Sequence, residues 1–289
     1  MEYLVHLAVM IAIYAVLAIA LDLLAGHTGL LCLAHAGLFG VGAYTSALLT
    51  TRWNLGFEIS FLGAAGAAVF ASLLVSLPSL RLHDDYFVIA TFGFQVICFS
   101  VFNNWMEVTR GPLGIVGIPP PSLFGWHLRD RTQFLLLAVL LAALAFIITR
   151  RVVSAPFGRV LHAVREDEVF GQSLGKNTVF IKVLTFAISA ALAGSAGSLF
   201  AHYVTYIDPT SFTVMESILI MSMVILGGAG SVWGPIIGAV VLTTLPEALR
   251  FMGLPSALAS NLRQMIYGGT MVLLMIFRPS GLVGKYGFK

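Results

Sequence analysis

The chain has 289 residues, of which 58% are hydrophobic and only 10% are charged, and its formal net charge is +3. A soluble domain carries charge on roughly a quarter of its residues, so this composition excludes an ordinary soluble protein and favours a membrane protein. The Lys and Arg residues form no basic block, which argues against nucleic acid as a partner.

The predicted elements are transmembrane helices, because crossing the hydrocarbon core takes about 20 mostly apolar residues. In chain order, such segments occupy residues 4–24, 28–49, 59–80, 86–103, 134–148, 179–203, 213–226, 232–245 and 262–277. The sequence therefore predicts a single all-α transmembrane domain over residues 1–289. We expect about nine spans, with eight to ten possible, because glycine-rich segments can be broken or re-entrant. The first span is not expected to be a cleaved signal peptide, since no basic residue precedes it.

The basic residues between the spans predict the orientation, because cytoplasmic loops carry an excess of Lys and Arg. With nine spans, nine basic residues fall at one set of span ends and six at the opposite set. This bias places the N-terminus outside and the C-terminus in the cytoplasm. Residues 104–132 then form a large outer loop, and residues 149–178 form a large cytoplasmic loop.

Glycine is dense around the second predicted span, with five glycines between residues 26 and 42. Each costs a helix about 1 kcal/mol relative to alanine, so their number indicates a special use of the backbone. Glycines let helices approach closely, and they also let a helix unwind where it lines a polar cavity. Both interpretations stay open. The second one makes pore-lining or substrate-path candidates of Thr28, Gly29, His35, Gly37, Gly40 and Gly42.

Few ionisable residues fall in or near the spans, and each is a candidate functional residue. A lone histidine such as His35 is, however, often a hydrogen-bonded packing residue. Glu216 closely follows an outer loop, so a role at the mouth of a pore competes with simple interfacial placement. Asp22 is expected at the cytoplasmic interface, where a carboxylate costs little free energy and does not by itself indicate a functional role.

A second glycine-rich segment, residues 226–235, adds Gly227, Gly228 and Gly230 to the substrate-path candidates. It echoes the spacing of residues 24–30, where glycines also precede an apolar run. Many transporters build a site at mid-membrane from two such interrupted helices in duplicated halves. A tight helix–turn–helix is the alternative.

The cytoplasmic loop contains a segment of helical length between Pro156 and Gly175. Apolar residues recur there at helical spacing, so a short amphipathic helix is expected. It could lie flat on the membrane, or dock into a cytoplasmic protein. Its mixed charges favour a protein partner, since anionic lipid does not select adjacent acids. The candidate residues for contact with such a partner are Arg159, Arg165, Glu166, Asp167, Glu168 and Gly175.

Motifs that would power transport or catalysis are missing from the sequence. It has no G-x-x-x-x-G-K-[ST] loop, no H-E-x-x-H, no G-x-S-x-G and no C-x-x-C. The chains of buried charges expected of an ion-driven carrier are absent as well. We therefore expect no enzymatic activity, no catalytic residues, no metal and no cofactor bound by this chain. The energy for transport must come from elsewhere.

Several stretches resemble the permeases of branched-chain amino acid ABC importers. The run LAHAGLFGVGAY at residues 33–44 is similar to the family signature S-L-G-H-A-x-F-F-G-x-G-A-Y. Residues 80–87, 111–115, 165–168, 226–235 and 277–282 agree with the family as well, in the family's order. Together they resemble the LivM-type subunit more than its LivH-type partner.

The resemblance implies that the chain is one subunit of a larger transport complex. A second, homologous permease chain of the LivH type would complete the pathway, and two cytoplasmic ATPase subunits would use ATP and Mg. A binding protein outside the membrane would deliver the amino acid, and residues 159–175 would be the coupling helix that the ATPase receives. The implied location is the bacterial or archaeal plasma (inner) membrane, as a multi-pass protein.

Departures from the family pattern limit what the resemblance implies about the substrate. Asp22 stands where Asn is usual, Cys32 where Ser is usual, and Ala34 where Gly is usual; Gly171 and Lys176 also depart from the pattern. Branched-chain or related neutral amino acids are the expected cargo. Urea or short amides carried by the same scaffold, or a stand-alone ion-coupled carrier, are the alternatives.

Overall fold

The computed structural model describes residues 2–79, 84–123, 126–127, 130–173, 175–251, 268–269 and 281–283. Five of its helices are long and apolar enough to cross a membrane. They are α1 (Glu2–Ala25), α3 (Phe57–Ser79), α4 (Asp84–Asn104), α6 (Arg131–Ser154) and α9 (Thr178–Val204). Each matches a span expected from the apolar runs. The chain is thus a helical membrane protein.

Three shorter apolar helices also belong to the described part of the bundle: α2 (His35–Thr51), α10 (Val214–Gly227) and α11 (Gly234–Phe251). Helix α2 begins seven residues later than expected, because residues 28–34 are not helical. The second predicted span is therefore broken, which was one of the possibilities left open. The ninth predicted span, residues 262–277, lies outside the described residues.

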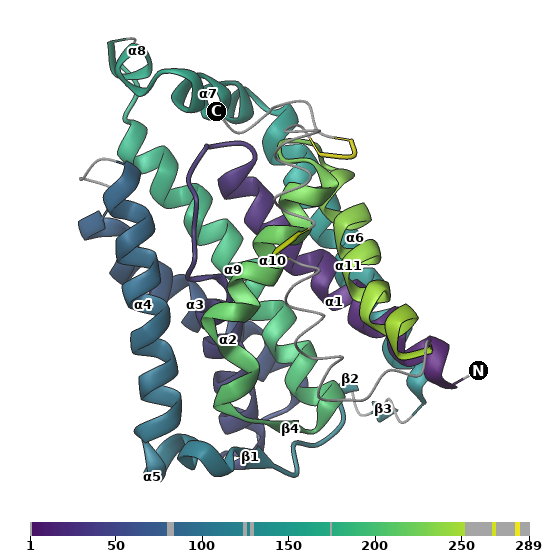
Figure 1. Cartoon of the computed structure of the whole chain (residues 1–289). Helices are drawn as coiled ribbons and strands as arrows, with labels where there is room; N and C mark the ends of the chain where they lie inside the picture. Colours follow the sequence, from purple (N-terminus) through teal and green to yellow (C-terminus); the bar gives the residue numbers. More distant parts are fainter. Residues whose placement is uncertain are drawn as a thin grey trace.

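The connecting segments gather at the two ends of the bundle (Figure 1). Helices α7 (Pro156–Glu166) and α8 (Glu168–Ser173) lie at one end. The opposite end carries α5 (Met106–Thr109), β1 (Ile115–Val116) and β4 (Tyr206–Ile207). Strands β1 and β4 pair antiparallel, with Ile115 opposite Ile207. The short elements η1 (Gly111–Leu113), β2 (Ser122–Leu123), β3 (Trp126–His127) and η2 (Pro209–Phe212) complete the chain order.

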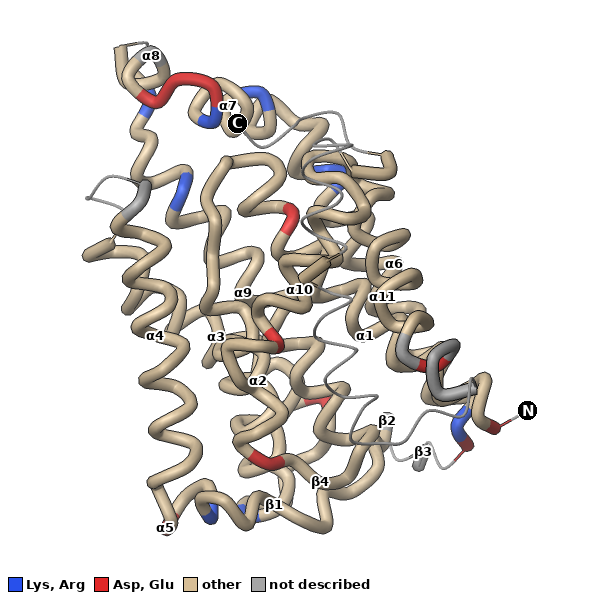
Figure 2. The backbone as a smooth tube through the Cα atoms, in the orientation of Figure 1, with Lys and Arg blue, Asp and Glu red and all other residues tan. Residues whose placement is uncertain are grey.

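The basic residues are distributed in the same way as the connecting segments. Among the described residues, Lys and Arg lie towards the two ends of the bundle, and the middle is almost free of them (Figure 2). The outer surfaces of α3, α4 and α6 carry large apolar side chains such as Leu62, Ile89 and Leu136. A water-soluble protein would not expose so many, so these surfaces are suited to lipid.

Small residues bring α2, α3 and α9 into close contact at the centre. A Cβ added to Gly42 would overlap the backbone of Gly194, and one added to Gly194 would overlap α3 at Ala64 and Ala68. Gly197 faces the backbone of α2 in the same way. Lipid gives helices no hydrophobic reason to associate, so such close packing is a main source of stability in the bundle.

Candidate functional site

The break between α1 and α2 places the N-terminus of α2 inside the bundle. The first amides of a helix have no partner within it, and lipid offers none. Here Ala36 donates from its backbone N to Ser217 Oγ (3.0 Å), and Gly37 donates to Gln95 Oε1 (2.5 Å). Gln95 also donates from Nε2 to the carbonyl oxygen of Phe212 (2.8 Å). Side chains from α4 and α10 thus accept hydrogen bonds from the first backbone amides of α2.

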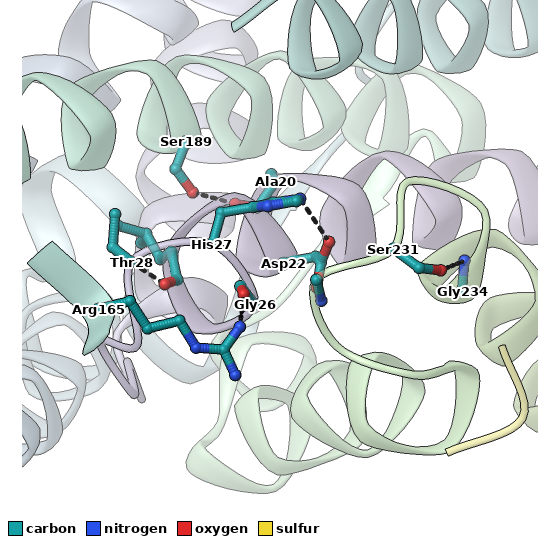
Figure 3. Close-up of polar contacts among 11 residues, drawn as sticks. Ala20, Asp22, Gly26, His27, Thr28, Arg165, Ser189, Ser231 and Gly234 are labelled. Atoms are coloured by element: carbon teal, nitrogen blue, oxygen red, sulfur yellow. Dashed lines mark hydrogen bonds and ion pairs between the residues drawn. The ribbon is translucent and has the colours of Figure 1, made fainter. Parts of the chain in front are cut away.

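The other substrate-path candidates on α2 lie in packed surroundings. His35 is fully buried, with Nε2 3.5 Å from Ser189 Oγ. The Ser189 hydroxyl also donates to the carbonyl oxygen of Ala20, which connects α9 to α1 (Figure 3). Gly40 faces Phe102 and Phe212, and Gly42 faces α9. In this conformation Gly40 and Gly42 therefore allow close packing, which is the first of the two interpretations of the glycine-rich segment.

Glu216 bonds to a residue halfway along a neighbouring helix. It belongs to the first turn of α10, and its Oε1 accepts a hydrogen bond from the Tyr14 hydroxyl (2.5 Å). Tyr14 lies halfway along α1, a helix of 24 residues, so the carboxylate sits well inside the bundle. A polar group at this depth, facing the middle of another helix, is a candidate for the substrate path.

The two glycine-rich segments, distant in sequence, meet at the α7 end of the bundle. Gly230 donates from its backbone N to Asp22 Oδ1 (2.8 Å), and a Cβ on Gly26 would overlap both groups. Asp22 is only 1% exposed, so its carboxylate is enclosed by protein at this end of the bundle. His27 Nε2 lies 3.5 Å from Asp22 Oδ2 (Figure 3). Gly227 and Gly228 form the adjoining turn, where Leu226 and Gly227 accept backbone hydrogen bonds from residues 282 and 283.

Helix α7 rests directly on this meeting point. Arg165 donates from Nη1 to the carbonyl oxygen of Gly26 (Figure 3), and its side chain packs against Gly29. The rings of His162 and His27 lie edge to face, with centroids 5.3 Å apart. Thr28 instead bonds back to the end of α1, through Leu24 O (2.5 Å). The inner face of α7 is thus fixed to the break between α1 and α2.

The structure divides the expected helix of the cytoplasmic loop in two. Asp167 adopts an extended conformation between α7 and α8, and Gly175 ends the segment with φ of 73°. Glu168 turns inwards and pairs with Lys182 of α9 (2.8 Å). Arg159, Glu166 and Asp167 are exposed at the end of the molecule. The six coupling candidates therefore separate into inward-facing and outward-facing groups.

The Glu168–Lys182 pair gives a direct prediction. Lys182 is 3% exposed, so Glu168→Lys leaves a buried cation facing a like charge. We expect the free energy of unfolding to fall by about 2 kcal/mol, below the usual cost of breaking a buried pair because Glu168 is partly exposed. The measurement is the thermal unfolding of the purified chain in detergent.

Glu166→Lys is the matched control, because Glu166 carries the same charge two residues away and is exposed. It should leave the melting temperature within about 1 °C of the original, as surface substitutions rarely matter. Adding Lys182→Glu to Glu168→Lys should restore most of the lost stability. Equal melting temperatures for the Glu166 and Glu168 variants would show that the pair does not anchor α8.

Four polar residues of this region had no role in the sequence-based prediction: Gln95, Ser217, His27 and Lys182. Gln95 and Ser217 are single uncharged residues in apolar helices, and no pattern distinguishes them. Lys182 had a usable signal, since a lysine inside a span needs an acidic partner and Glu168 lies 14 residues before it. Among the described residues, no group of three or more His, Cys, Asp or Glu side chains is arranged to hold a metal ion.

Known proteins resemble this chain in sequence over most of its length. Residues 3–275 match the family described as "Branched-chain amino acid transport system / permease component". The permease protein LivM of the high-affinity branched-chain amino acid transport system is 38% identical in both Salmonella typhimurium and Escherichia coli. In each case the match covers 96% of this chain and 69% of the relative. LivH of Escherichia coli is 26% identical over 94% of this chain and 91% of its own length.

Proposed function

The chain belongs to the permease family of branched-chain amino acid transport systems, and on this basis we propose how it acts in an ATP-binding-cassette importer. It is a permease subunit of a branched-chain amino acid importer. The similarity to LivM over nearly the whole chain carries this conclusion. Because α7 packs on the break between α1 and α2, we place there the point at which energy from ATP hydrolysis reaches the permease.

In this proposal the chain forms half of the translocation pathway and crosses the bacterial or archaeal inner membrane about nine times, as its apolar runs predict. Its N-terminus lies outside and its C-terminus in the cytoplasm. The end that carries α7 and α8 is then cytoplasmic, and the end with β1 and β4 faces outwards. The excess of Lys and Arg at the α7 end supports this orientation.

A second permease of the LivH type supplies the other half. Both LivM and LivH are similar to this chain over at least 94% of its length, which supports two related subunits side by side. Two ATPase subunits bind and hydrolyse ATP with Mg, and this chain holds neither. They contact the outward-facing group of α7 and α8: Arg159, Glu166 and Asp167. A binding protein delivers the amino acid at the opposite end.

The pathway opens alternately to the two sides of the membrane, because ATP binding at the cytoplasmic end is linked to the conformation of the permease. ATP binding closes the ATPase pair, and the closed pair binds one conformation of the permease more tightly than the other. The equilibrium moves towards that conformation by the difference in binding free energy, and no more. The half-buried acid Glu216 and the start of helix α2 are the parts of the pathway where the bundle offers polar groups at depth.

Reconstitution tests the proposal. The permease pair, its ATPases and the binding protein, in proteoliposomes with radiolabelled leucine, should show uptake that requires ATP. The same vesicles without the ATPase subunits are the control and should show only leakage. Excess isoleucine or valine should compete, and excess urea should not. Uptake by the chain alone would falsify the proposal and favour a stand-alone carrier.

A further inference from the structure

Three segments far apart in the sequence are joined by two polar contacts at the cytoplasmic end. Arg165 of α7 donates to the carbonyl oxygen of Gly26, just after the end of α1. Asp22, one turn earlier, accepts a hydrogen bond from the backbone N of Gly230, at the turn before α11 (2.8 Å). We call these two bonds the relay contacts; Figure 3 shows the one between Arg165 and Gly26.

The Asp22–Gly230 contact is buried, and the Arg165–Gly26 contact is partly buried. Asp22 and His27 are each 1% exposed, and Leu161 and Val164 are buried under α7. A hydrogen bond broken in such surroundings is not replaced by one to water, so breaking it leaves unpaired polar groups at a high cost in free energy. Movement of α7 is therefore expected to carry the attached segments with it.

The two glycine-rich segments held by the relay contacts have backbone conformations that suit hinges. Gly29 and Gly230 have φ of 77° and 76°, conformations that other residues rarely adopt, and the backbone around each is not helical. Gly26 has no room for a Cβ between Asp22 and Gly230, so the two segments touch at their backbones. Non-helical residues at the ends of helices absorb the dihedral changes of a hinge.

We propose that Arg165 and Asp22 are positioning residues that transmit the movement of α7 to both glycine breaks. The inference rests on the proposed function, and it gives Arg165 a role different from contact with the ATPase. The bond to Gly26 moves the end of α1 and the non-helical residues that lead from it to α2. The bond to Gly230 passes the same movement to α11, so both sides of the pathway respond together.

The test uses the complete complex in proteoliposomes and compares Arg165→Leu with Arg165→Lys. Leucine removes the donor to Gly26, and lysine keeps a cationic donor of similar reach. With Arg165→Leu we expect the ATPases to bind and hydrolyse ATP as before, while leucine uptake per ATP falls about 2- to 30-fold, the range of coupling energies along such networks. Arg165→Lys should recover most of the uptake.

Asp22 gives an independent arm if Arg165→Leu does not assemble. Asp22→Asn keeps an oxygen that accepts from Gly230 and should stay near the original uptake per ATP, whereas Asp22→Leu should lose it. Because the two contacts act in series, the double variant with leucine at both positions should be no worse than the worse single one. Arg150→Leu, exposed at the end of α6, is the control and should change nothing.

The outcomes separate the inference from the proposed function. No ATP-dependent uptake by the unsubstituted complex would reject the proposed function itself. A normal unsubstituted complex with unchanged uptake in Arg165→Leu and Asp22→Leu would overturn the relay alone. Loss of ATPase binding in parallel with uptake would also overturn it, since Arg165 would then be a docking residue. Equal losses in Asp22→Asn and Asp22→Leu would contradict the role of the Gly230 bond.

Discussion

Gly42→Leu is expected to prevent the bundle from assembling in its native form. Gly42 faces the backbone of Gly194, and a Cβ alone would already overlap it. Leucine adds three further carbons where two helix backbones touch, so α2 and α9 must separate. Overpacking commonly costs about 1–3 kcal/mol when side chains can adjust, and more is expected here because the obstacle is backbone. Fluorescence-detected size-exclusion chromatography after heating in detergent measures the effect.

Gly66→Leu is the matched control. Gly66 lies in α3 of the same bundle, and a Cβ there meets nothing within 4 Å. The variant should run as the original protein and should keep its melting temperature within about 2 °C, as surface changes usually do. Gly42→Ala should fall between the two, because it adds a single carbon. A Gly42→Leu protein with the original melting temperature would show that α2 and α9 do not cross so closely.

The sequence was sufficient to predict most of the helices, because apolar length is a strong signal in a membrane chain. The bounds of α3, α4 and α10 match within two residues, which is the usual disagreement between assignments. The start of α2 was harder to place, since residues 28–34 are as apolar as the helix that follows. The break between α7 and α8 was also missed, because Asp167 stands in a run of charged residues that all suit a helix.

The candidate site was predicted only in part. The glycine-rich segments were identified, but their meeting depends on Asp22 and Gly230, which are 208 residues apart. No local pattern contains a contact of that kind. The charge pattern around Arg165 predicted a coupling segment as a region, and it could not tell which charges point inwards. That distinction depends on how α7 packs, with Leu161 and Val164 turned towards the bundle.

Gln95→Met is expected to destabilise the chain strongly and to stop transport, although it replaces one uncharged side chain of similar length with another. Gln95 is the residue that both accepts from Gly37 and donates to the carbonyl oxygen of Phe212. Methionine fills the space and leaves both backbone groups unpaired. Each unpaired buried group costs about 1–3 kcal/mol, so the free energy of unfolding should fall by about 2–6 kcal/mol. Thermal unfolding in detergent and leucine uptake by the complete complex measure the two effects.

Gln133→Met provides the same substitution at an exposed position near the start of α6, and it should change neither quantity. Ser217→Ala should have an intermediate effect, because it removes only the acceptor of the Ala36 amide. A broken helix inside a membrane needs partners for its first amides, and this chain supplies them from α4 and α10. If Gln95→Met melts and transports like Gln133→Met, the start of α2 must find its hydrogen bonds elsewhere, and the broken helix would not depend on α4.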